Sequence, residues 1–521
     1  MVKGGYIMNR YLGLLRITRV LLAVLLISLS CTGVASGIEE VRVALRDEPS
    51  TVNPLIYGTS SKPVFWAVYQ GLMGLTNMEK DGRKDLELAD SVEILPSKRE
   101  IKVTLRKGPR FHTDDPVTAH DVKFTYDGIT DPENASTIAS IVDEIEEIEV
   151  IDEHTLIFRF FEPYAAWANV LSAPIASKKY YEKVGKKRFG AHPIGSGPFR
   201  FVSWEKGSSI TLEGIPDHLD HPVSFNRLTF VFVRDGTTRT AMLESEDLDL
   251  ITDIAPHQAV QLRKKGHLRI KTTDKVPCLF SLGTKASWFP ELKDKRIRLA
   301  IHYAINRQEI VDRLYMGAGY PVYIYADKIA FGYDSTLTRE YNPEKARQLL
   351  KEAGYDHSKP MTLVYTNMIP NGNLLAQIIQ RYLQNVGIKI KLHQIEWGTY
   401  VTYLRSNNKN AGHMSITAKR WDVDPDVKLK FVWKSDGFAC MYTDRPNQAE
   451  FDRLILAQSK ELDHQKRVDI LKKIYRLDFD DPAYVPLFGL QMIYGMNKRI
   501  DYTWNDGSDE IAKLYNIRIL E

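Results

Sequence analysis

The sequence is poor in cysteine, with three residues among 521: Cys31, Cys278 and Cys440. Neither Cys278 nor Cys440 has the close spacing of a metal-binding pair. An oxidising compartment would permit a disulfide between these two, and separate buried thiols are the alternative. The cysteines therefore indicate no metal site and leave the disulfide open.

The motifs of several enzyme classes are also lacking. Ser196 lies in GSGPF, which is not the Gly-x-Ser-x-Gly elbow of a hydrolase. There is no His-Glu-x-x-His zinc helix and no phosphate-binding P-loop. The 13 histidines are scattered, and even His112 and His120 do not form a metal-binding pair. We therefore predict a protein that is not an enzyme and that has no cofactor and no metal, with a secreted hydrolase as the rival hypothesis.

Apolar runs long enough to cross a membrane are missing as well. The run VLLAVLLISLS at 20–30 is shorter than the roughly twenty residues that a bilayer requires. Four basic residues precede this run, the small residues CTGVASG follow it, and no acid occurs before Glu39. This pattern is typical of a secretory signal peptide, which we place at residues 1–36. We expect export to the periplasm, with a lipid anchor on Cys31 as the alternative, although Ser28 stands where a lipobox has Leu.

The mature chain also lacks an excess of charge. The formal net charge of +4 includes four positive charges within residues 1–36, so the mature chain carries a net charge of about zero. Nucleic acids and anionic membranes attract proteins through an excess of positive charge. The composition therefore argues against either of them as the main partner.

The sequence predicts mainly strands in the first half of the mature chain. Residues 95–165 contain three segments of alternating apolar residues around one helix, and Thr118 and Asp121 predict a capping box at the start of that helix. Strand patterns return at 197–214 and 226–235. We expect a β-rich unit with few helices here.

After Leu282 helices alternate with strands, which is typical of a separate α/β unit. One helix is expected over 293–317. Another is expected over 342–354, because Asn342, Pro343 and Gly354 stand at the usual cap positions. The strand–helix–strand pattern that follows predicts two parallel strands.

The segment RWDVDPDVKLKFVW at 420–433 places three carboxylates on alternate positions. A calcium loop that began at Asp422 would need Gly at its sixth position and Glu at its twelfth, where this chain has Val427 and Trp433. We therefore reject calcium and interpret Asp424 and Asp426 as turn and cap residues. We also expect Trp397 and Tyr400, upstream of this segment, to pack in the core.

Four blocks of sequence carry a resemblance to a known family. They are EPSTVNPLIYGTSSKPVFWAVYQGLMGL (48–75), LRKGPRFHTDDPVTAHDVKFTYDGITDP (105–132), PIGSGPFRFVSW (193–204) and DKRIRLAIHYAINRQEIVD (294–312). In this order they are similar to the extracytoplasmic solute-binding proteins of ABC importers, family 5, the oligopeptide-, dipeptide- and nickel-binding type. Asp115 departs from that pattern, because the family has Gly there.

The resemblance implies an α/β, two-lobed periplasmic-binding-protein fold of type II, cluster C, with an extra domain inserted in the first lobe. Hinges are expected near residues 280 and 484. The implied divisions are a signal peptide at 1–36, lobe one at 37–75, an inserted domain at 76–189, the return of lobe one at 190–280, lobe two at 281–483 and the C-terminal part of lobe one at 484–521.

The resemblance also implies a function. The chain would capture a small solute, with peptides as the first choice, by hinge closure between its lobes. It would then deliver the solute to the importer's permease subunits with their ATPases. A chelated metal, a sugar or an opine-like compound is the alternative solute. We expect a monomer.

Six candidate ligand-binding residues follow from the resemblance: Trp421, Arg420, Asp422, Lys419, Asn53 and Trp66. In peptide-binding relatives an Asp of this loop pairs with the ligand's α-ammonium. Ungapped alignment puts Trp421 at that position, and Asp422 takes the role only if the loop has lost residues. Lys419 and Arg420 stand where some relatives bind the ligand's carboxylate, and Trp421 could stack on a ring or a cation.

Overall fold

The computed structural model describes residues 39–56, 61–74, 85–366, 369, 371–405, 412–420, 423–437, 439–504 and 511–520, with backbone only at 275–277, 401 and 405. From Glu40 onward they belong to one compact unit. Within these residues, none of the helices combines the length and the apolar character that a bilayer span requires.

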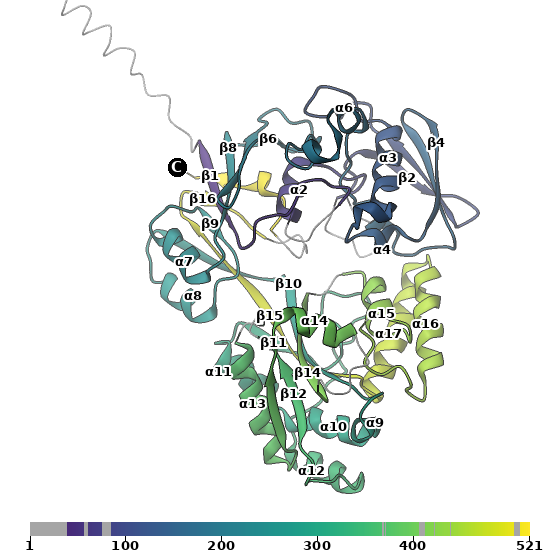
Figure 1. Cartoon of the computed structure of the whole chain (residues 1–521), viewed down its shortest axis with the longest axis vertical. Helices are drawn as coiled ribbons and strands as arrows, with labels where there is room; N and C mark the ends of the chain where they lie inside the picture. The colour runs from purple at the N-terminus through teal and green to yellow at the C-terminus, as the bar shows by residue number, and fades with distance from the viewer. Residues whose placement is uncertain are drawn as a thin grey trace, which may run out of the picture. The chain divides into compact units, whose positions relative to one another are not determined.

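One large mixed sheet runs through the described residues (Figure 1). Its strands are β1 (Glu40–Leu45), β6 (Phe199–Glu205), β7 (Ser209–Gly214), β8 (Arg227–Phe232), β9 (Leu250–Ile251), β10 (Leu268–Thr284), β11 (Gly319–Pro321), β12 (Met361–Tyr365), β13 (Ile390–Gln394), β14 (Met414–Arg420) and β15 (Tyr484–Asn497). Their order is β13-β12-β14-β10-β15-β9-β1-β8-β7-β6, and β11 pairs with β15. β12 and β13 are parallel, which confirms the prediction for these two strands.

The long strands β10 and β15 connect the two halves of this sheet. Leu268–Thr273 pairs with Met492–Asn497 beside β9, whereas Cys278–Gly283 pairs with Tyr484–Leu490 beside β14. The register shifts between Thr273 and Cys278. An irregular ladder has fewer regular hydrogen bonds to hold its two ends in one orientation. The β10–β15 ladder is therefore irregular where the two halves meet, and a second register shift lies between Phe280 and Ser281.

We call the part of the chain that carries β1–β9 the first lobe and the part that carries the helices α9–α17 the second lobe. The helices of the first lobe are α2 (Lys62–Val68), α3 (Ala119–Thr130), α4 (Ala139–Val142), α5 (Trp167–Val170), α6 (Lys178–Phe189), α7 (Gly236–Glu244) and α8 (Pro256–Leu262). Those of the second lobe are α9 (Pro290–Lys293), α10 (Lys295–Ala304), α11 (Arg307–Leu314), α12 (Pro343–Glu352), α13 (Gly372–Asn385), α14 (Trp397–Arg405), α15 (Asp426–Val432), α16 (Gln448–Lys460) and α17 (His464–Asp480). An extended apolar cluster, from Leu279 to Phe488, forms the core of the second lobe.

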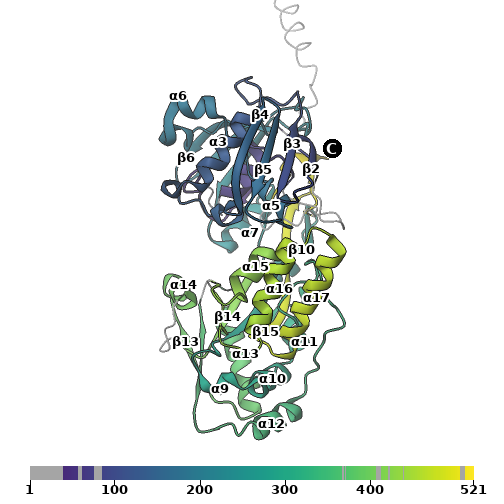
Figure 2. The same ribbon diagram turned by 90° about the vertical axis from the view of Figure 1, so that its right-hand side faces the viewer.

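A second sheet of four strands, in the order β2-β3-β5-β4, lies within the first lobe (Figure 2). Its strands are β2 (Ala89–Ile94), β3 (Glu100–Leu105), β4 (Ile145–Asp152) and β5 (Thr155–Phe160). We call residues 89–189 the four-stranded subdomain. It has its own apolar cluster, and the predicted capping box is confirmed: Thr118 N donates to Asp121 Oδ2 at 3.0 Å at the start of α3.

The GSG sequence around Ser196 is a close-packing site. A Cβ on Gly197 would lie 2.7 Å from the backbone carbon of Val68, and one on Gly195 would overlap the Val68 carbonyl oxygen. Gly197 N also donates to Val68 O at 2.8 Å. These glycines therefore let the return of the first lobe lie directly against the end of α2.

Two local predictions are corrected by the structure. The expected single helix over 293–317 is wrong, because α10 ends at Ala304 and Asn306 caps a new helix, α11, by accepting from Glu309 N at 3.1 Å. The prediction that Trp397 packs in the core is wrong, since this side chain is 47% exposed, whereas Tyr400 is buried as expected. The helix at 342–354 is confirmed by α12, where Asn342 Oδ1 accepts from Lys345 N.

The two cysteines within the described residues, Cys278 and Cys440, are free thiols. Cys278 is half-buried on β10, and Cys440 is buried in the second lobe. The open question of a disulfide is therefore decided in favour of two separate thiols.

Candidate functional site

β14 brings two cationic side chains to the place where the halves of the large sheet meet. Its first four residues are buried, and its last three are half-buried. Lys419 pairs with Leu279 on β10, and Arg420 pairs with Cys278 beside the register shift. Because successive side chains of a strand point to opposite faces, Lys419 and Arg420 face different surroundings.

The ammonium of Lys419 is buried and forms no hydrogen bond with any described residue. The ring centroid of Phe431 lies 5.1 Å from its Nζ. Burial, with a smaller contribution from the charge of Lys428, lowers the pKa of Lys419 from 10.5 to about 7. A buried cation without a counter-charge is costly. This position is therefore suited to an anionic group from outside the described residues.

Arg420 reaches across to the first lobe. Its Nη2 lies 3.6 Å from Asp253 Oδ1, and about a quarter of the Arg420 side chain and a third of the Asp253 side chain are exposed. Asp253 follows β9 in a left-handed backbone conformation, with φ at 57°, which Asp tolerates better than most residues. The two lobes therefore contribute opposite charges to one site.

Trp421 and Asp422 lie outside the described residues. Their predicted roles, as a stacking residue and as an amine anchor, stay predictions. They follow Arg420 directly and precede the Asp424 turn, so the chain places them between the cationic strand end and a buried acidic turn.

The acidic turn is paired within the protein. Asp424 accepts from Arg467 Nη1 at 2.7 Å and from Arg467 Nη2 at 2.6 Å, and its Oδ1 also accepts from Asp426 N at the start of α15. Asp426 accepts from Gln458 Nε2 at 2.6 Å and from the hydroxyl of Tyr164 at 3.0 Å. Both carboxylates are buried. The expected turn role therefore agrees with the contacts of Asp424, whereas Asp426 lies in the first turn of α15 and, in the contacts described, its side chain caps no helix. No group of metal-ligating residues occurs in the described part of the chain.

Asn53 and Trp66 lie elsewhere in the first lobe. Asn53 is fully buried, and its Oδ1 accepts from Leu55 N at 3.0 Å, so it shapes the loop after β1. Trp66, on α2, is 9% exposed and its indole Nε1 makes no hydrogen bond with a described residue. The contacts described for these two side chains do not include Lys419 or Arg420.

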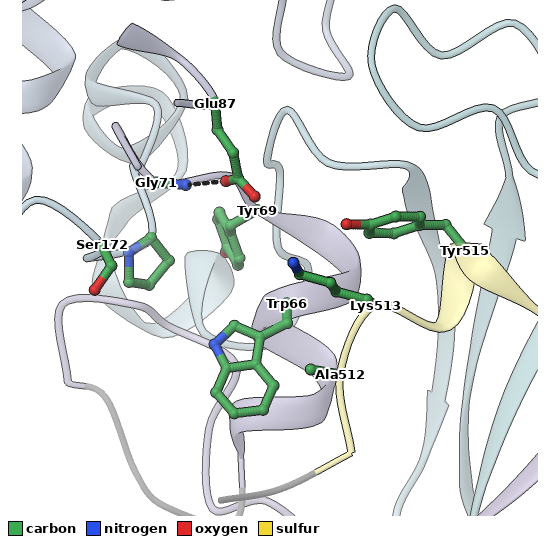
Figure 3. Close-up of a pocket in the computed structure, with 9 residues that line it drawn as sticks. Trp66, Tyr69, Gly71, Glu87, Ser172, Ala512, Lys513 and Tyr515 are labelled. Carbon is green, nitrogen blue, oxygen red and sulfur yellow. Dashed lines mark hydrogen bonds between the residues drawn. The ribbon is translucent and has the colours of Figure 1, made fainter. Parts of the chain in front are cut away.

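Trp66 lines a small cavity of about 20 Å³ together with Tyr69, Glu87 and Lys513 (Figure 3). Glu87 Oε2 accepts from Gly71 N at 3.1 Å, and burial raises the pKa of Glu87 to about 7, against the opposing influence of Gly71 and Lys513. Such a volume holds about one water molecule. The cavity is therefore too small for a solute in this conformation.

Several of these groups could not be found from the sequence. Asp253, Glu87 and Arg467 are single charged residues in segments without a distinctive pattern. Arg467 and Asp253 gain their partners, Asp424 and Arg420, from segments that are distant in the chain. Only the blocks around Lys419 and Trp66 offered a local signal.

The arrangement of the sheet is shared with solved structures. The ABC transporter substrate binding protein CtaP from Listeria monocytogenes superposes with a TM-score of 0.82 at 22% identity, over 93% of this chain and 100% of that one. NikZ from Campylobacter jejuni, solved in complex with Ni(L-His), gives a TM-score of 0.75 at 20% identity, over 92% and 98% of the two chains. The fold is thus that of a two-lobed periplasmic binding protein of type II.

The family follows from the sequence. The model of the bacterial extracellular solute-binding proteins, family 5 Middle, matches residues 86–438, and the chain belongs to this family. The glutathione-binding protein GsiB of Salmonella choleraesuis is 25% identical over 500 residues, which is 91% of this chain and 95% of that protein. Di/tripeptide-binding protein 1 of Pseudomonas aeruginosa is 27% identical over 462 residues, 82% and 84% of the two chains. Members of this family bind solutes and are not enzymes.

Proposed function

We propose that the chain is the extracytoplasmic substrate-binding component of an ABC-type importer, and that it captures a small peptide between its lobes. The permease subunits with their ATPases would then receive the peptide. The names of the relatives support this proposal, since they include a glutathione-binding and a di/tripeptide-binding protein. The likeness to CtaP, an ABC transporter substrate binding protein, supports the importer role.

The observation that carries the proposal is the buried ammonium of Lys419, which has no hydrogen-bond partner among the described residues. A peptide C-terminus would supply the missing negative charge. Arg420 is the next residue but points to the opposite face of β14, so it would contact a different group of the solute once it turns from Asp253. Hydrogen bonds between charged groups are about twice as strong as neutral ones, which suits a main anchor.

Trp421 and Asp422 complete the proposed site. Trp421 would stack on a side chain of the solute, and Asp422 would pair with its amine. In this proposal Asn53 shapes the first lobe, and Trp66 contacts a solute only in a conformation that opens its cavity. The solute would therefore be held mainly by residues 419–422.

Capture would proceed by rotation of the lobes about β10 and β15. The register shift between Thr273 and Cys278 supports a hinge there. We keep the divisions expected from the sequence, with the second lobe at 281–483 and an inserted domain at 76–189. A solute favours closure only through its higher affinity for the closed form.

A non-peptide solute is the second candidate. NikZ was solved with Ni(L-His), and histidine also carries a carboxylate. The site of Lys419 would serve such a chelate as well as a peptide. Both candidates share an anionic group, whereas a neutral sugar would leave Lys419 without a partner.

The test is a thermal-shift series on the mature protein with trialanine, trialanine C-terminal amide, Ni(L-His) and a neutral disaccharide. A solute that binds only the folded state raises its apparent stability. We expect trialanine to raise the melting temperature and its amide to do so far less. A shift with the disaccharide alone would end the anionic-solute proposal, and native mass spectrometry would identify any solute that co-purifies.

The cellular location and the oligomeric state are also part of the proposal. We propose export to the periplasm with removal of residues 1–36, and a monomer in solution. A lipid anchor on Cys31 is the alternative, and mass spectrometry of the protein from its native membrane fraction decides between the two.

A further inference from the structure

A group of polar side chains joins the four-stranded subdomain to the second lobe. Tyr164, after β5, donates its hydroxyl hydrogen to Asp426 Oδ2 at 3.0 Å. Lys430, one turn along α15 from Asp426, lies 3.0 Å from that carboxylate and donates to Glu144 Oε1 at 2.7 Å. Asp426 is fully buried and Tyr164 is 4% exposed. We call Glu144, Tyr164, Asp426 and Lys430 the inter-lobe network.

The second lobe holds its half of the network firmly. Gln458 on α16 donates to Asp426 Oδ1, and its side-chain oxygen Oε1 accepts from Arg467 Nε at 3.1 Å. Arg467 in turn donates two hydrogen bonds to Asp424. The network is therefore continuous with the turn that directly follows residues 419–422.

Backbone contacts lie beside the network. Ala165 N donates to Ser459 O at 2.7 Å, so the segment after β5 also bonds to α16. In Figure 1 the helices α15–α17 stand below α4 and to the right of β10 and β15, which carry the chain between the lobes. Contacts away from the connecting strands separate more than contacts beside them when the lobes rotate. Opening would therefore break the bonds from Tyr164 and Glu144 first.

The charges on the second lobe remain compensated after such a break. Asp426 keeps its bond from Gln458 and its ion pair with Lys430, which belong to the same lobe. Of the network itself, only the Tyr164 hydroxyl and the Glu144 carboxylate would pass to water, and the bond from Ala165 N to Ser459 O beside it would break with them. Because no buried charge of this network is left alone, the network can open and close at modest cost.

We propose that Glu144 and Tyr164 are positioning residues for solute capture. They hold α15, and with it the turn at Asp424, in the closed arrangement, so that the four-stranded subdomain sets how long a solute is retained. This inference rests on the proposed function for its kinetic consequence. Its structural part, an effect on lobe closure, stands without a solute.

The experiment compares full mature protein carrying Tyr164→Phe with Glu144→Gln against wild type and a matched control. Tyr126→Phe is the control, because Tyr126 is buried and donates to Val170 O at 2.7 Å within the subdomain, away from the second lobe. Small-angle X-ray scattering of the solute-free protein reports the ratio of open to closed molecules. Stopped-flow measurement with trialanine reports association and dissociation rates.

We expect the double variant to raise the open-to-closed ratio and the dissociation rate about tenfold, with little change in the association rate. Tyr126→Phe lowers the melting temperature but changes neither quantity. Equal scattering from wild type and the double variant, or an equal change in the control, would overturn the inference. If trialanine fails to bind wild type, the peptide proposal falls, and the scattering result still decides whether the network controls closure.

Discussion

Two charged regions lie close together along the chain of the second lobe and differ in how their charges are compensated. Lys419 at the end of β14 is a buried cation with no hydrogen bond to a described residue. Asp424 and Asp426, in the turn that follows, are buried anions with partners from Arg467, Gln458 and Tyr164. Both regions are equally conspicuous in the sequence, so charge alone does not separate structure from function.

The difference shows which charges are available to a solute. A buried charge that is paired within the protein already has a counter-charge. Such a pair often adds little to stability, but removing one partner is strongly destabilising. An uncompensated charge lowers stability until a ligand arrives. Substitutions in the two regions should therefore change the free energy of unfolding in opposite directions. This comparison gives four predictions, which are ordered by the size of the effect.

The largest effect is expected from breaking the paired region. Arg467→Met leaves Asp424 buried without its bidentate partner, and we expect the free energy of unfolding to fall by about 3–5 kcal/mol. Chemical denaturation followed by circular dichroism measures this change. Arg453→Met is the matched control, since Arg453 pairs with Glu450 on the exposed face of α16 and the loss of such an exposed pair should change the free energy of unfolding far less. Equal effects from both variants would contradict the comparison.

The paired region also shows what sequence reasoning can and cannot reach. Periodicity and cap residues predicted α3, α12 and the strands around them, because those signals are local. The sequence does not predict the break between α10 and α11, because the apolar stripe continues through it. The first helix ends where Ile305 becomes extended, and Asn306 then caps the second. Trp397 looked like a core residue because it is aromatic, yet its exposure depends on which face α14 presents.

The sequence predicts only part of the candidate site, for the same reason. The resemblance pointed to Lys419 and Arg420, which lie together at the strand end. It also pointed to Asn53, whose side chain is fully buried in the first lobe. The partners Asp253, Arg467 and Tyr164 come from segments far from this strand in the chain, and no local pattern marks a residue whose role depends on such a long-range contact.

The second prediction concerns the uncompensated cation. Lys419→Met removes the proposed carboxylate anchor, and we expect the affinity for trialanine to fall about a hundredfold. The same substitution should raise the free energy of unfolding by about 4 kcal/mol at pH 6, because it removes a buried charge whose pKa is lowered to about 7. Isothermal titration calorimetry and denaturation measure the two effects. A variant that loses stability as well as affinity would place Lys419 with the paired region.

The third prediction tests the same charge through pH. The folded-state pKa of Lys419, about 7, lies below its unfolded value of about 10.4, so the unfolded chain binds more protons between these two values. The penalty is therefore fully present below pH 7 and is lost as the pH rises towards 10. We expect the advantage of Lys419→Met over wild type to shrink by about 1 kcal/mol per pH unit above pH 7. A constant difference from about pH 6 to about pH 9 would show that Lys419 does not titrate in this range.

The smallest effect is expected where the two lobes share a charge pair. Asp253 and Arg420 are 3.6 Å apart and partly exposed, and such pairs contribute about 1 kcal/mol or less. Asp253→Asn is the suitable change, because Asn also tolerates the left-handed backbone at this position. We expect almost no change in the free energy of unfolding and a roughly threefold gain in trialanine affinity, since Arg420 no longer has to leave a carboxylate, a gain of under about 1 kcal/mol. If the affinity falls instead, Asp253 itself binds the solute, and the first lobe supplies an amine anchor opposite Lys419.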